Sequence, residues 1–228
     1  MRGSCRGVLA LAPLLAAVLA VAVAGLGWGA TAARASTWSL TAVPLPAGRA
    51  GGELTSVSCT ATSACTAVGE YFDASEAPVP LAEGWDGTAW SLQTAPTTSN
   101  AGYIGLVGVS CTSTAWCMAV GDYGPPGSNV PATFAEVWDG SGWVIVPSPS
   151  PGVGGPNAQL ASVSCLSAQA CMAVGNYYDG AYPVGLAERW DGSSWSVVPV
   201  PEPTGTTESK LFGVSCRRRL PARQGRGV

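Results

Sequence analysis

Three copies of one short string, VGEY, VGDY and VGNY, each place a carboxylate or amide side chain next to a tyrosine. Two carboxylates at a suitable separation can hydrolyse glycosides, and aromatic faces beside polar groups suit the recognition of sugars or peptides. Acidic loop residues are usually just solvated, so ligand binding is favoured over catalysis. The candidate ligand-binding residues are Glu70, Tyr71, Asp73, Asp122, Tyr123, Asn176, Tyr177 and Asp179. The competing interpretation of the aromatic residues is that half of them pack between neighbouring elements.

The chain contains no histidine, and this excludes several kinds of chemistry. Ser-His-Asp and Cys-His catalysis both need an imidazole, as do His-ligated zinc, copper and iron sites. Between residues 36 and 216 the only arginines are Arg49 and Arg189, too few to surround a substrate carboxylate. We therefore expect no cofactor and no metal, and we name no catalytic residue.

Six cysteines form three pairs of identical spacing between two apolar strings, VSC and CxAVG. Antiparallel strands joined by a short turn bring such residues within disulfide reach. The expected disulfides are Cys59–Cys65, Cys111–Cys117 and Cys165–Cys171. The alternative, structural zinc, wants four ligands and is disfavoured by one pair per repeat. Each bridge closes a short loop and is worth about 2 kcal/mol in the loop-entropy model.

These pairs belong to a longer repeat. Equivalent cysteines are 52, 54 and 51 residues apart, and each unit holds four short strand signals with an Asp-Gly turn between the third and fourth. A period near ~50 with four strands predicts an all-β fold, a partial β-propeller. We expect three full blades at 53–99, 105–152 and 159–203, and edge strands at 38–44 and 211–216. Exposed strand edges make self-association a further expectation.

One alanine and one glutamate recur side by side on the third strand of each unit: Ala82-Glu83, Ala135-Glu136 and Ala187-Glu188. Neighbouring residues on a strand point to opposite faces. The small alanine suits close packing between blades. The glutamate either faces a ligand or, as we favour, anchors a hydrogen bond to backbone or to a Trp indole N–H.

Residues 1–35 have the pattern of a secretory signal, with Arg2 and Arg6 before an apolar run and Ala33-Arg34-Ala35 after it. The alternative is an uncleaved helix that anchors the chain in a membrane. All fourteen acidic residues lie between Glu53 and Glu208. This acidic body disfavours nucleic acid and anionic membranes as partners. We expect a secreted protein that has no membrane contact after cleavage.

The last twelve residues, 217–228, depart from the repeat. Where the pattern predicts a cysteine the chain has Ala222, and five of the twelve residues are arginine. Two explanations stay open: an out-of-frame, truncated propeller, or a genuine basic tail.

The strings VSCxxxxxCxAVGxY and LAExWDGxxWS make residues 38–216 resemble secreted bacterial β-propeller repeat proteins of the kelch and galactose-oxidase-like kind. The WDGxxW turn also looks like the Asp-box turn of sialidase-type propellers, but it lacks their Ser-x-Asp pattern. The resemblance implies a fold and little about activity. We expect a secreted binding module for an extracellular glycan, cell-envelope or protein ligand. The alternatives are a glycoside-acting enzyme and a non-functional fragment.

Overall fold

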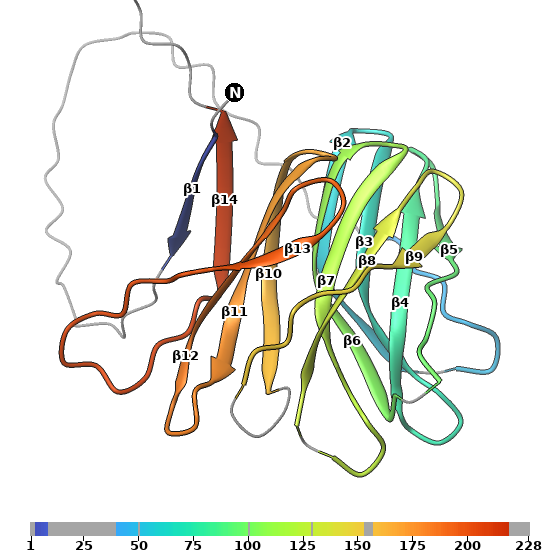
Figure 1. Cartoon of the computed structure of the whole chain (residues 1–228). Helices are drawn as coiled ribbons and strands as arrows, with labels where there is room; N and C mark the ends of the chain where they lie inside the picture. Colours follow the sequence, from blue (N-terminus) through green and yellow to red (C-terminus); the bar gives the residue numbers. More distant parts are fainter. Residues whose placement is uncertain are drawn as a thin grey trace, which may run out of the picture.

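A computed structural model describes residues 3–8, 40–49, 51–99, 101–128, 130–152 and 157–218 of the protein. All regular elements in these ranges are β-strands. Twelve of them form three four-stranded antiparallel sheets, each made from consecutive strands (Figure 1). Sheet 1 comprises β2 (Gly52–Ala61), β3 (Ala64–Phe72), β4 (Pro78–Trp85) and β5 (Trp90–Gln93). Sheet 2 comprises β6 (Tyr103–Ser113), β7 (Trp116–Gly124), β8 (Ala132–Trp138) and β9 (Trp143–Ile145). Sheet 3 comprises β10 (Ala158–Ser167), β11 (Ala170–Tyr178), β12 (Pro183–Trp190) and β13 (Trp195–Val198).

The first hairpin of each sheet carries the expected disulfide. In sheet 3, Cys165 lies directly opposite Cys171 in the β10–β11 register, and their sulfurs are bonded. The equivalent bonds in sheets 1 and 2 join the other two predicted pairs, Cys59–Cys65 and Cys111–Cys117. All three predicted pairings are therefore confirmed, and each bridge stays within its own sheet.

The predicted Asp-Gly turn closes the last hairpin of each sheet. In sheet 3, Asp191 Oδ1 accepts the backbone N–H groups of Ser193 and Ser194, each at 2.9 Å. Gly192 has φ 104°, a left-handed conformation that glycine adopts without strain. The flanking indoles of Trp190 and Trp195 lie opposite each other with ring centroids 5.6 Å apart. The aromatic pair thus packs over the turn that the Asp-Gly dipeptide makes.

The glycine of the recurring AVG string is required by close backbone approach. Strand one of each sheet shifts register between Leu54 and Ser56 or at the equivalent place. This irregularity brings a carbonyl oxygen of strand one against the glycine of strand two. A Cβ on Gly121 would collide with the carbonyl oxygen of Gly105. Only glycine fits there, which explains its recurrence as Gly69, Gly121 and Gly175.

The three sheets stack face to face, and the core lies between them. Between sheets 1 and 2, Val68 and Ala82 pack against Leu106, Phe134 and Trp143. Met118, Val120 and Ala135 of sheet 2 pack in the same way against sheet 3. Two of the recurring third-strand alanines, Ala82 and Ala135, lie in these interfaces, as expected, whereas Ala187 lies on the other face of sheet 3. The first strands β2, β6 and β10 lie side by side along the stack, and β14 (Gly213–Arg218) continues the row at the end of sheet 3 (Figure 1).

The chain ends differ in part from the expected edge strands. Of the strand expected at 38–44, the described residues 40–44 form none, although Val43 lies against sheet 1. Within the described ranges, no third strand of another sheet lies beside this segment for it to pair with. The strand expected at 211–216 is β14, which starts and ends two residues later and includes Arg217 and Arg218 of the expected tail.

Part of the expected signal segment is also a strand. β1 (Gly3–Val8) pairs antiparallel with β14, and Cys5 lies opposite Cys216, which is disulfide-bonded. The rest of the apolar run and the expected cleavage site lie outside the described residues, as do residues 219–228. Within the described ranges, no helix has the length and apolar character needed to cross a membrane.

Candidate functional site

The candidate ligand-binding residues predicted from the sequence lie at or just after the end of the second strand of each sheet. Glu70 on β3, Asp122 on β7 and Asn176 on β11 occupy equivalent positions after the AVG string. Glu70 and Asp122 lie on the face that their sheet turns toward the next sheet, because each is two residues beyond a valine of that face, and Asn176 has the same place on sheet 3. These positions gather polar side chains near the sheet-to-sheet junctions.

Four residues at the junction of sheets 1 and 2 interact, and we call Glu53, Glu70, Tyr103 and Asp122 the rim cluster. Glu53 and Glu70 face each other across β2 and β3. Tyr103 at the start of β6 donates its hydroxyl to Asp122 Oδ2 at 3.2 Å. Glu70 Oε2 lies over the backbone of β6, where a Cβ on Gly105 would be only 2.9 Å away. The absent side chain at Gly105 thus makes room for the Glu70 carboxyl.

Burial raises the pKa values of two carboxyls of the cluster, those of Glu70 and Asp122. Burial, with the nearby charges of Glu53 and Asp122, raises the pKa of Glu70. Burial also raises the pKa of Asp122, against the lowering effect of the Tyr103 hydrogen bond. The pKa of Tyr103 rises to about 12, through burial and the neighbouring Asp122. Half-buried carboxyls with raised pKa values can donate as well as accept hydrogen bonds, which suits an uncharged polar ligand.

The predicted residues Asp73 and Asp179 lie apart from this cluster, in turns. Asp73 Oδ1 accepts the backbone N–H groups of Ser75 and Ala77, at 2.8 and 3.1 Å. Asp179 Oδ1 accepts the N–H groups of Ala181 and Tyr182, both at 2.8 Å. These hydrogen bonds lower the pKa of both carboxyls. The two aspartates shape the loops between the second and third strands.

The predicted aromatic residues are divided between packing and surface. Tyr123 contacts Phe134 edge-on, with ring centroids 6.1 Å apart. Tyr177 packs against the core between sheets 2 and 3. Tyr71 is half-buried beside Gly52 and the exposed Phe72. The structure therefore brings Glu70 and Asp122 together, whereas Tyr123 and Tyr177 contribute mainly to packing. Sequence reasoning missed Tyr103 and Glu53, which stand at the start of strand one outside the recurring string.

The recurring glutamates form a second unusual feature, since their side chains are fully buried. Glu136 lies opposite Ala119 and therefore faces sheet 1, and Glu188 lies opposite Ala173 and faces sheet 2. Glu83 occupies the same position on the face of sheet 1 that no other sheet covers. Burial raises the pKa of Glu83 and Glu188 to about 7 and that of Glu136 to about 8.

The expected anchor, a hydrogen bond to backbone or to a Trp indole N–H, is not found among the described residues, and Glu188 alone of the three glutamates has a partner there, which is a serine. Ser148, in the segment after β9, donates its hydroxyl to Glu188 Oε2 at 2.7 Å. Neither carboxyl oxygen of Glu83 or Glu136 has a partner in the described part of the protein. The repeat explains the difference, because Ala95 holds the position of Ser148 five residues after the tryptophan of the fourth strand. Val43 holds the same position before sheet 1.

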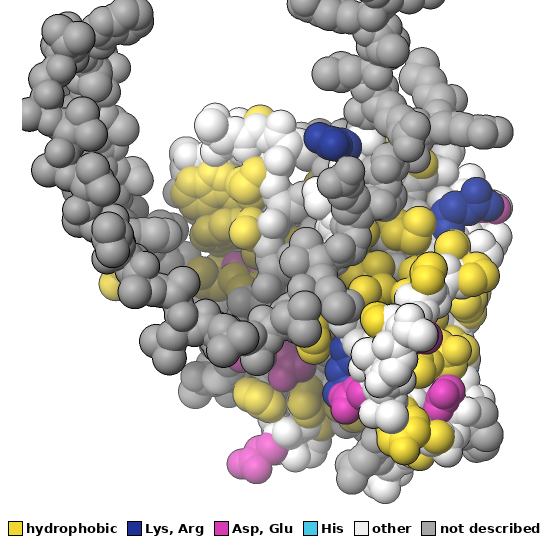
Figure 2. All heavy atoms as spheres, turned by 90° about the vertical axis from the view of Figure 1, so that its left-hand side faces the viewer, with side chains coloured by type: hydrophobic (Ala, Val, Ile, Leu, Met, Phe, Trp, Pro, Cys, Tyr) yellow, Lys and Arg dark blue, Asp and Glu magenta, His cyan; other side chains and the backbone are white. Residues whose placement is uncertain are grey.

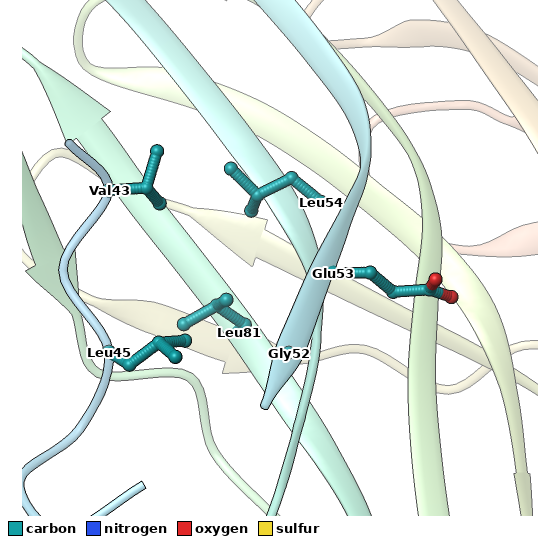
Figure 3. Close-up of a pocket in the computed structure, with 6 residues that line it drawn as sticks. All are labelled: Val43, Leu45, Gly52, Glu53, Leu54 and Leu81. Carbon is teal, nitrogen blue, oxygen red and sulfur yellow. The ribbon is translucent and has the colours of Figure 1, made fainter. Parts of the chain in front are cut away.

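The uncovered face of sheet 1 carries a shallow apolar hollow. Val43, Leu45, Leu54 and Leu81 point toward one another across it, while Glu53 points away (Figure 3). A neighbouring hollow extends along β2 and is lined by Val43, Leu54, Val57, Ala67 and Trp90, among others. Both hollows lie between the segment 40–49 and sheet 1.

No group of three His, Cys, Asp or Glu side chains in the described ranges is arranged to hold a metal ion. The three bonded cysteine pairs are typical of proteins that fold in an oxidising compartment. In comparisons with known proteins, no family model and no curated protein matches the chain.

Proposed function

We propose that the protein is a secreted interaction module, built from propeller blades, that binds an uncharged polar ligand at the rim cluster. The ligand class is a carbohydrate or a peptide of the cell envelope. The stacked four-stranded sheets, each with its own disulfide and Asp-Gly turn, support the assignment as blades.

The observation that carries the proposal is the pairing of Glu70 with Asp122 across the junction of sheets 1 and 2. Their carboxyl groups repel each other and remain half-buried although neither takes part in a salt bridge within the described ranges. Asp122 accepts one hydrogen bond, from the Tyr103 hydroxyl, and within the described ranges no side chain donates to the Glu70 carboxyl. Hydroxyl or amide groups of a ligand would supply the missing hydrogen bonds without adding charge.

A glycan array and a pull-down with cell-wall material test this function. We expect binding that falls at least about tenfold in Asp122→Asn or Glu70→Gln, because one hydrogen bond to a charged or half-buried group is lost. Glu76→Gln is the matched control, since Glu76 is exposed in the loop before β4, away from the cluster. Binding that is equally strong in all three variants would contradict the proposed site.

The second candidate function is glycoside hydrolysis by the same two carboxyls. The observation in its favour is that each of Glu70 and Asp122 has a raised pKa, as a general acid needs. Turnover on a panel of glycosides, lost in Asp122→Asn, would favour the enzyme. Ligand binding without turnover would favour the binding module.

A further inference from the structure

Consecutive sheets are joined by a repeated hydrogen-bond pattern between their first strands. The hydroxyl of Ser58 on β2 accepts the backbone N–H of Cys111 on β6, at 2.9 Å. Cys165 donates in the same way to Ser110 at 3.0 Å, and Cys216 of β14 donates to Ser164 at 3.0 Å. Each accepting serine immediately precedes the first cysteine of its own unit. The serine of the recurring VSC string therefore makes this contact, or joint, between sheets.

A second hydrogen bond accompanies the joint at two of the three junctions. The N–H of Val109 donates to Ser56 Oγ at 3.2 Å, and the N–H of Val214 donates to Ser162 Oγ at 3.4 Å. At the middle junction Gly108 replaces the serine, and the backbones approach so closely that a Cβ there would lie 3.2 Å from Ser162 Cα. The joint thus tolerates serine or glycine at this place.

Sheet 1 presents the donor side of this joint, the backbone N–H of Cys59, on a face without a partner sheet in the described ranges. Leu54 and Val57 are 36 and 58% exposed, whereas the equivalent Leu106 and Val109 of sheet 2 are 1 and 7% exposed. Cys59 occupies the position whose backbone N–H donates to a serine hydroxyl in sheets 2 and 3, but within the described ranges no serine hydroxyl accepts the N–H of Cys59. The face therefore has the shape and chemistry of a sheet-to-sheet contact that is not made.

The opposite end of the stack presents the acceptor side of the joint, a serine hydroxyl. Ser215 precedes Cys216 on β14 and is exposed. Gly213 stands where Gly108 allows close approach at the middle junction. Figure 2 views the molecule from this end, where apolar and uncharged side chains lie beside charged side chains of both signs.

The segment before sheet 1, residues 40–49, indicates what kind of strand packs on the exposed face of that sheet. Val43 has the repeat position of Ser148, whose segment after β9 contacts Glu188 of the following sheet. The chain therefore already supplies the end of a fourth strand over sheet 1, and β14 supplies a first strand. Both are parts of one blade position, and they lie at opposite ends of the same stack (Figure 1).

We propose that the exposed face of sheet 1, formed by Leu54, Val57 and Cys59, docks onto β14 of a second copy of this chain. Ser215 Oγ of one copy accepts the N–H of Cys59 of the next, as Ser58 accepts that of Cys111. The contact is head-to-tail, so that copies add in one direction and form either a ring or a longer array. This assembly is independent of ligand binding at the rim cluster.

Sedimentation velocity of the full chain over a range of concentrations tests the assembly. We expect the mass to grow with concentration. Val57→Asp should weaken association more than about 100-fold, because an unpaired charge would be buried in the contact. Ser215→Lys should do the same from the other side. Val144→Asp is the control, since Val144 is similarly exposed on β9, outside the contact.

Mixing the two blocked variants makes the test directional. Val57→Asp retains an intact β14 end, and Ser215→Lys retains an intact sheet 1 face, so their mixture should form a one-to-one dimer that neither forms alone. Tryptophan fluorescence and circular dichroism verify that each variant is folded. A wild-type chain that stays monomeric at all concentrations would overturn the proposal. So would variants that associate like the control, or a mixture that stays monomeric.

Discussion

Replacing Glu136 by glutamine should remove part of the pH dependence of stability. The Glu136 side chain is fully buried between sheets 1 and 2, and neither of its oxygens has a hydrogen-bond partner among the described residues. Burial raises its pKa from 4.5 to about 8, so the folded protein holds a proton that the unfolded chain releases near pH 4.5. Stability from this group is therefore fully present below pH 4.5. It is lost as the pH rises toward 8.

The size of this effect follows from the displacement of the pKa. Between pH 5 and pH 7 the unfolded chain has largely lost the proton and the folded chain keeps it. Each pH unit in this window costs up to about 1.4 kcal/mol, so the wild-type protein should lose about 2.5 kcal/mol of unfolding free energy through Glu136. Glutamine has nearly the same shape and does not ionise, so the variant should lose about 2.5 kcal/mol less over the same interval.

Urea unfolding at pH 5 and pH 7, followed by tryptophan fluorescence, measures this difference. Glu76→Gln makes the same chemical change at an exposed site and should leave the pH dependence of the wild type intact. Glu83 and Glu188, whose pKa values are raised to about 7, should keep a smaller slope of the same sign in Glu136→Gln. If Glu136→Gln and the wild type lose stability equally between the two pH values, the carboxyl is not buried as described.

Three further substitutions test the packing between and within the sheets. Ser148→Ala should lower the unfolding free energy at pH 7 by about 1–3 kcal/mol and raise the pKa of Glu188, because a buried carboxyl oxygen loses its donor; unchanged denaturation curves would exclude that contact. Ala95→Ser should supply Glu136 with the equivalent hydroxyl and add about 1 kcal/mol at pH 7, and destabilisation instead would show that the position does not face the carboxyl. Gly121→Ala should cost about 1–3 kcal/mol, since its Cβ meets a carbonyl oxygen of the facing strand, and a neutral result in thermal unfolding would refute the close approach.

Local features of the fold were predictable because their causes lie within a few residues. The six-residue cysteine spacing sets the first hairpin, and the Asp-Gly dipeptide sets the last. The alternation of Ala187 and Glu188 on β12 correctly separated the two faces of the sheet. The third-strand alanines then identified the surfaces that pack between sheets.

The environment of the glutamates could not be predicted from the repeat alone. Whether such a carboxyl has a partner depends on Ser148 for Glu188 but on Ala95 for Glu136, each in the segment before the next sheet, 40 residues before its glutamate in the case of Ser148. Distance in sequence also hid Tyr103, because its contact with Asp122 spans 19 residues. The role of aspartates in loops was also ambiguous in the sequence. Asp73 accepts hydrogen bonds within its own turn, and the sequence does not distinguish such a residue from one that binds a ligand.

The central claim is that each repeat forms its own four-stranded sheet with a disulfide across its first hairpin. Peptide mapping of the unreduced protein by mass spectrometry, after proteolysis that separates the repeats, tests it most directly. The account predicts that Cys59 is bonded to Cys65, Cys111 to Cys117 and Cys165 to Cys171, with no bond between repeats. Peptides from different repeats joined through these six cysteines, or free thiols among them, would contradict it.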